Sequence, residues 1–155
     1  MKKKLTIIFT IIVLLLLLFF IFKDKIFMKK AVISNSNLEV TIKYPSLSFK
    51  YNKDDKTITS KTSTITLNIK DDLDENTTYE IISDYKKMTY NGKEKKFSKN
   101  DGIYYYNSLE KRYEVIIKLN NKSYLEIDIK DKNDIDKAFN SKNIQDILQS
   151  IEIKD

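Results

Sequence analysis

The feature that most constrains this chain is an uncharged apolar run of eighteen residues near its N-terminus, Leu5 to Phe22. A helix of this length is about 27 Å long, close to the hydrocarbon thickness of a bilayer. Lysines stand on both sides of the run, at positions 2–4, 23, 25, 29 and 30. The run therefore predicts a single transmembrane helix, with residues 1–30 as an N-terminal membrane anchor with Lys flanks.

A cleaved signal peptide is the alternative interpretation, because Met1–Lys4 resembles the basic start of such a peptide. The apolar run is longer than usual for a signal peptide, and no small-residue cleavage site follows it closely. A retained signal-anchor is the favoured interpretation. The lysine counts on the two sides are too similar to set the orientation. Since N-terminal anchors of this kind usually export the domain C-terminal to them, we expect a single-pass plasma-membrane protein with an extracytoplasmic C-terminal domain.

The net charge of +6 belongs entirely to the anchor segment. Residues 1–30 hold seven lysines and a single acid, Asp24, so the remainder has 21 basic and 21 acidic residues. A domain without excess positive charge has little to offer phosphates, and we expect no nucleic-acid partner. The abundance of Lys, Asn, Ile and Tyr, which share AT-rich codons, indicates a low-GC bacterium.

Strand signals dominate the chain from Leu38 onward. Apolar and polar residues alternate over 38–44, 47–51 and 65–69, and a β-meander is expected over 93–98, 103–107, 112–119 and 123–130. In the last hairpin, an odd-numbered loop such as Asn120–Lys122 sets Ile117 opposite Leu125. A two-residue loop at 120–121 would instead split the apolar face, so the odd loop is favoured.

Helical spacing appears in three places. A helix is expected at about 77–89, after Asn76 as a plausible N-cap, and two short apolar faces follow at 135–139 and 144–151, the second capped by Ser141. A last short strand is expected at 151–153. The predicted fold class is α+β: the N-terminal transmembrane helix, a tether at 31–37, and a domain at 38–155 in which helices cover one face of a twisted antiparallel sheet.

Three segments carry a family resemblance: Lys43-Tyr44-Pro45 after the first strand, the 77–89 helix after the 65–69 strand, and residues 147–153 at the end. Their order resembles the PsbP-like fold found in many small exported bacterial proteins. The resemblance covers most of 38–155 and implies a mostly non-enzymatic role. The chain departs from the exported lipoproteins of that group because it lacks a lipidated cysteine. A shared fold does not decide function.

Tyrosines supply the best candidate for a partner surface: Tyr104, Tyr106 and Tyr124. Residues 104–106 are three consecutive tyrosines, which place rings on both faces of one strand. The alternative is ordinary packing, with Tyr105 in the core and its two neighbours covering the outer face.

Chemistry-bearing clusters are few, because the sequence has no cysteine and no histidine. The acidic runs 71–75 and 131–136 suggest calcium, but helix-start chemistry accounts for both, and no metal is expected. Glu114, Glu126 and Asp128 can meet on the outer face of the last hairpin, where cross-strand ion pairs are favoured over a carboxylate-only hydrolase. We therefore expect no catalytic residue, no cofactor and no enzyme.

Two functions from different classes remain. The first is a membrane-anchored, non-enzymatic binding module of the bacterial cell envelope, whose partner is a protein or envelope component. The second is an accessory or regulatory subunit of a membrane protein complex, which pairs through the anchor itself, with Thr6 and Thr10 as polar contacts.

Overall fold

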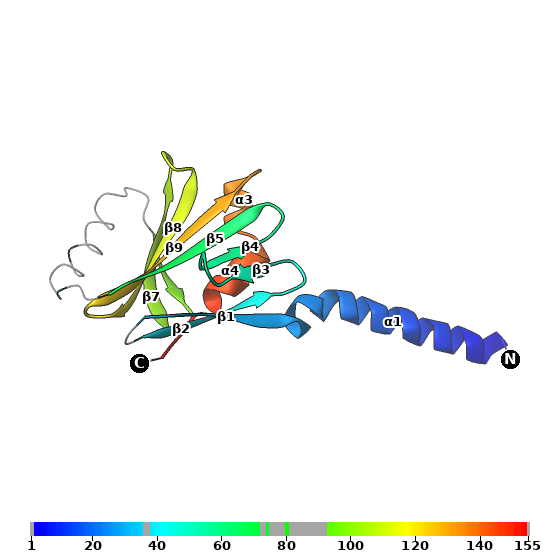
Figure 1. Cartoon of the computed structure of the whole chain (residues 1–155). Helices are drawn as coiled ribbons and strands as arrows, with labels where there is room; N and C mark the ends of the chain where they lie inside the picture. The colour runs from blue at the N-terminus through cyan, green and yellow to red at the C-terminus, as the bar shows by residue number, and fades with distance from the viewer. Residues whose placement is uncertain (1, 36–37, 72–73, 75–79, 81–92, 155) are drawn as a thin grey trace.

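The computed structural model describes residues 2–35, 38–71, 74, 80 and 93–154, and for residues 2–6 and 21–26 it describes the backbone alone. A long helix, α1 (Lys2–Ile26), projects from a domain built mainly of strands (Figure 1). Strand accounts for 51% of the chain and helix for 23%. The fold is therefore mostly β, and the predicted α+β class is corrected.

The transmembrane helix predicted for residues 5–22 is also wrong. Within the part of the chain that the structure describes, no helix is long and apolar enough to cross a membrane.

The strands form two antiparallel sheets, where the sequence predicted one. The smaller sheet has the order β1-β2-β10, built from β1 (Met28–Ser34), β2 (Glu39–Pro45) and β10 (Glu152–Lys154). The larger sheet has the order β3-β4-β5-β9-β8-β7-β6, built from β3 (Lys50–Asn52), β4 (Thr57–Thr59), β5 (Ser63–Lys70), β6 (Lys93–Phe97), β7 (Asn100–Asn107), β8 (Arg112–Asn120) and β9 (Ser123–Asp131).

Strand β1 occupies much of the segment that the sequence assigned to a tether. Its residues pair with β2 in register from Met28 opposite Pro45 to Ser34 opposite Glu39. Ala31 is buried in the core. The folded domain therefore extends back to the end of α1.

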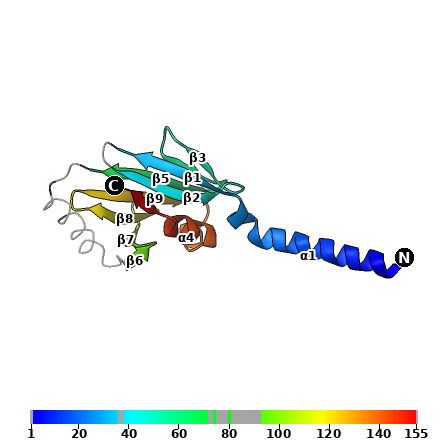
Figure 2. The same cartoon turned by 90° about the horizontal axis from the view of Figure 1, so that it is seen from below.

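One hydrophobic core lies between the two sheets and the two short C-terminal helices, α3 (Ile135–Phe139) and α4 (Lys142–Gln149) (Figure 2). Helix α4 packs on β2, and α3 packs on β8 and β9. Ser141 caps α4 as predicted, because its hydroxyl accepts a hydrogen bond from the N–H of Ile144. The helix predicted at about 77–89 and its cap lie outside the described residues, Glu80 excepted.

The last hairpin has the predicted register, but a two-residue turn with a β-bulge produces it instead of an odd-numbered loop. Ile117 lies opposite Leu125, as expected for an odd loop. The turn itself holds only two residues, 121 and 122, between Asn120 and Ser123. A β-bulge at Leu119 supplies the extra residue that keeps the apolar faces together.

Candidate functional site

The structure divides the three tyrosines of the predicted partner surface between two faces. Tyr104 and Tyr106 lie on the core face of β7, since Tyr104 is opposite the buried Val115. Tyr124 lies on the other face of the sheet, next along β9 to the core residue Leu125, and is only 7% exposed. Tyr105 faces away from the core, the reverse of the packing that the sequence suggested.

Most of these rings take part in packing. The ring centroids of Tyr113 and Phe139 are 4.0 Å apart with planes 13° from parallel, and Tyr104 lies 5.1 Å from the same Phe139 ring. The hydroxyl of Tyr113 donates to Asp136 at 2.7 Å. Burial raises the pKa of Tyr113 to about 12, and the bond to Asp136 adds to the increase. Tyr106 keeps an exposed ring, 40% accessible.

Glu114, Glu126 and Asp128 do come together on the outer face of the large sheet. Glu114 lies opposite Asp128, and Glu126 is two residues before Asp128 on the same strand face. One ligand oxygen from each lies within 4.8 Å of the others. Glu114 is buried, and the other two are partly buried. Sheet pairing thus gathers three acids that the sequence spreads over fifteen positions.

Hydrogen-bond donors surround this carboxylate cluster. Arg112 donates from Nε to Glu114 Oε1 at 2.7 Å and from Nη1 to Asp128 Oδ2 at 3.1 Å. Asn107 donates to the same Glu114 oxygen at 2.8 Å, and the hydroxyl of Tyr105 donates to the other. The arrangement is a buried ion-pair network centred on one guanidinium, which matches the favoured cross-strand interpretation.

Electrostatics of the cluster favour proton uptake. The pKa of Glu114 is raised to about 7, mainly by burial and also by the charges of Asp128 and Glu126, while Lys130 acts in the opposite direction. Burial also raises the pKa of Glu126 and of Asp128. Since Arg112 already supplies positive charge between two of the acids, a divalent cation would have to compete with its guanidinium.

The segment 131–136 forms the start of a helix, which is the interpretation that the sequence favoured over calcium binding. Asp131 Oδ1 accepts the N–H groups of Asn133 and Asp134, and Oδ2 accepts the Ser63 hydroxyl at 2.6 Å. Burial acts to raise the pKa of Asp131, but these hydrogen bonds outweigh it, and the pKa is lowered. Asp134 caps α3 through the N–H of Lys137. In the other acidic run, Asp71 accepts a bond from Asn35, and most of 72–75 lies outside the described residues.

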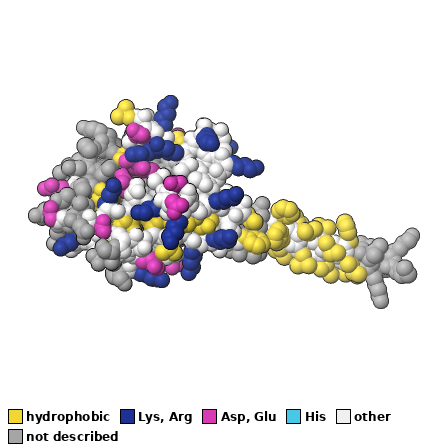
Figure 3. All heavy atoms as spheres, viewed as in Figure 1, with side chains coloured by type: hydrophobic (Ala, Val, Ile, Leu, Met, Phe, Trp, Pro, Cys, Tyr) yellow, Lys and Arg dark blue, Asp and Glu magenta, His cyan; other side chains and the backbone are white. Residues whose placement is uncertain are grey.

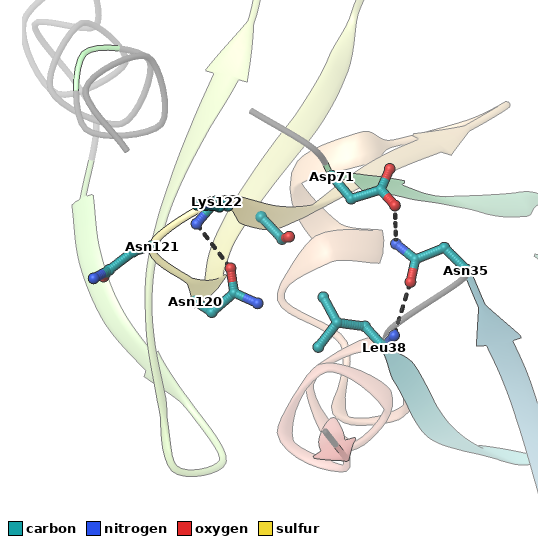
Figure 4. Close-up of a pocket in the computed structure, with 7 residues that line it drawn as sticks. Asn35, Leu38, Asp71, Asn120, Asn121 and Lys122 are labelled. Carbon is teal, nitrogen blue, oxygen red and sulfur yellow. Dashed lines mark hydrogen bonds between the residues drawn. The ribbon is translucent and has the colours of Figure 1, made fainter. Parts of the chain in front are cut away.

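A pocket of about 510 Å³, which the sequence did not predict, is lined mostly by polar residues (Figure 4). Asn35, Leu38 and Asp71 line it on one side, and residues 120–123 of the β8–β9 turn line it on the other. The side chain of Asn35 joins two of the other lining residues: it donates a hydrogen bond to Asp71 at 2.7 Å and accepts one from the N–H of Leu38 at 2.9 Å. The asparagines gave no signal of a pocket because each also suits a turn.

Helix α1 presents the largest exposed apolar surface of the described residues. Large apolar side chains are exposed at nearly every position from Ile7 to Phe20, so helical spacing places them on all sides of the helix. Figure 3 shows one of these sides. Thr10 is the one polar residue among them. An apolar surface of this extent marks a contact with another apolar phase or molecule.

No family model, no curated protein and no solved structure matches this chain. The resemblance to the PsbP-like fold therefore stays a prediction.

Proposed function

We propose that the chain is a non-enzymatic binding module that α1 attaches to a lipid membrane of the bacterial cell envelope, with the β domain at the membrane surface. The observation that carries the proposal is the apolar surface on all sides of α1 between Ile7 and Phe20. Each such side chain gains about 1.5–3 kcal/mol when it is fully removed from water. Attachment needs only that these side chains enter lipid, and crossing of the bilayer is no part of the proposal.

Lipid suits this surface better than one protein partner does. A helix that pairs with one protein carries a single apolar stripe and a polar opposite side. On α1 the exposed apolar residues are consecutive, for example Leu14 to Phe20, and leave no polar side. The sequence also places lysines on both sides of the run, where they suit anionic headgroups.

A binding role for the domain is supported by the side of it where β7 and β8 join. Tyr106 is 40% exposed there, and Leu109 in the connecting turn is 94% exposed. Exposed aromatic side chains are typical of protein contacts. The carboxylate cluster lends no support to catalysis, because ion pairing accounts for its groups.

Vesicle flotation tests the attachment. The full chain is mixed with phosphatidylcholine vesicles, with and without phosphatidylglycerol, and centrifuged in a density gradient, which separates bound protein from aggregates. We expect the chain to float, and the Ile12→Lys/Leu16→Lys variant to remain at the bottom. Ile12→Ala/Leu16→Ala is the matched control and should still float. A chain that stays at the bottom with both lipids, and forms oligomers that the lysine variant cannot form, would overturn the proposal in favour of protein pairing.

A further inference from the structure

The turn between β2 and β3 is fastened to the end of α1. Both the N–H and the hydroxyl of Ser46 donate to the carbonyl of Phe27, at 2.8 and 2.7 Å. Next to Ser46, Leu47 is 55% exposed, and Phe27 itself is 40% exposed. Two exposed apolar side chains are therefore held at the end of the domain from which α1 projects (Figure 1).

Basic residues stand close in the chain to these two apolar residues. Lys29 and Lys30 follow Phe27 on β1, and Lys50 follows the turn on β3; all three are exposed. The register places Lys29 opposite Tyr44 and Lys30 opposite Lys43, so they lie at the same end of the small sheet as the turn. On the face shown in Figure 3, dark-blue side chains gather at the end of the domain next to α1.

We propose that Phe27, Lys29, Lys30, Leu47 and Lys50, here called the junction patch, dock on anionic lipid headgroups. The apolar side chains enter the interface between headgroups and acyl chains, and the ammonium groups contact the phosphates. The inference rests on the proposed attachment by α1 and adds to it an orientation. A domain docked in this way lies with one end on the membrane, instead of swinging freely on its helix.

Charge complementarity and continuity with α1 favour lipid as the occupant. A surface next to a lipid-bound helix meets headgroups without any further association step, so their effective concentration there is high. Lys43, which lies opposite Lys30 across the strands, forms an ion pair with Glu152 at 2.6 Å and is not counted among the lipid contacts. The three exposed lysines of the patch have no ion pair among the described residues.

Site-specific fluorescence tests the docking, and the absence of cysteine from the chain makes it clean. An environment-sensitive dye is attached at Ser48→Cys, beside Leu47 in the same turn. The control dye is attached at Lys122→Cys in the β8–β9 turn, which lies at the opposite end of the domain from α1 (Figures 1 and 2). Both labelled full chains are mixed with phosphatidylglycerol-containing vesicles that carry a headgroup-attached quencher.

We expect the dye at position 48 to shift to shorter wavelength and to be quenched several-fold more than the dye at position 122. Leu47→Ser, and separately Lys29→Gln/Lys30→Gln/Lys50→Gln, should reduce that quenching at least twofold while the chain still floats with the vesicles. Equal quenching at the two positions by a chain that floats would overturn docking and leave attachment intact. A chain that does not float at all would overturn both. Quenching at position 48 that is unchanged by both variants would also overturn the junction patch.

Discussion

Glu114 of β8 lies directly opposite Asp128 of β9, and the guanidinium of Arg112 bonds to both. Like charges opposite each other on a sheet normally repel. Here one cation from the same strand face offsets the repulsion, and the third acid, Glu126, has Lys70 at 4.0 Å. The cluster therefore depends on a balance that pH and single substitutions can shift.

Replacing Glu114 with Gln should weaken the dependence of stability on pH. Burial raises the pKa of Glu114 to about 7, above the ~4.3 of an unfolded chain. The folded state then binds more protons than the unfolded state between these values, so this group's contribution to stability falls as pH rises through that window, by ~1–3 kcal/mol. Urea unfolding should show that, from pH 5 to pH 8, the free energy of unfolding decreases less in Glu114→Gln than in the wild type. Glu110→Gln, at an exposed position on the adjacent turn, is the control. Identical slopes in wild type and Glu114→Gln would contradict the assignment.

Arg112→Met should destabilise the domain by about 3–5 kcal/mol at pH 8, because it leaves buried carboxylates without their shared cation. Arg112→Lys should recover part of the loss, since an ammonium restores the charge without the two-pronged geometry. Guanidinium unfolding at fixed pH measures both. Equal stability of the Met and Lys variants would mean that the charge of Arg112 is unimportant.

Gly102→Ala should cost about 1–3 kcal/mol through overpacking. A Cβ added at Gly102 would lie 2.7 Å from Cδ2 of Phe97 and 3.0 Å from the carbonyl oxygen of Ile116. Phe97 is fully buried and has little room to move. Thermal unfolding of the single variant, and of Gly102→Ala combined with Phe97→Leu, checks this account. The second change should restore part of the lost Tm, and failure to do so would place the strain elsewhere.

The variants Tyr104→Ser and Tyr106→Ser should show that Tyr104 has a packing role, whereas Tyr106 is a surface residue. Tyr104 packs against Phe139 and Phe97, so its loss should lower stability by about 2–4 kcal/mol. Replacing the exposed Tyr106 should lower stability by less than about 1 kcal/mol. Urea unfolding compares the two. If Tyr106→Ser loses more stability than this, Tyr106 has a structural role and is not purely a surface contact residue.

Local patterns in the sequence predicted local structure well. The apolar spacing of Ile144, Ile147 and Leu148 placed α4, and the period of two set Ile117 opposite Leu125. The same period could not orient the tyrosines, because three consecutive identical residues carry no alternation. Their faces are set instead by Val115, which pairs with Tyr104 across the strands.

Long-range pairing was beyond the sequence. The segment that forms β1 appears polar in the sequence because Lys29 and Lys30 follow its first residue, and Ala31 is buried where β1 pairs with β2. The gathering of Glu114, Glu126 and Asp128 was foreseen from the hairpin register. The raised pKa of Glu114 was not, since it requires the burial that the whole sheet provides. The apolar run predicted the composition of α1 correctly, but among the described residues no helix is long and apolar enough to cross a membrane.

Strand β2 is the central strand of the small sheet and pairs with one strand from each end of the domain. Strand β1 precedes it, whereas β10 reaches it from about 110 residues farther along, with Ile153 opposite Val40. Just before β10, the Ser150 hydroxyl accepts the N–H of Lys43 and donates to its carbonyl. During synthesis, the edge of β2 that pairs with β10 therefore stays without its partner strand until residues 152–154 have been made. A chain clipped before α4 would expose that edge together with Ile42, and it should aggregate rather than persist as a partly folded monomer.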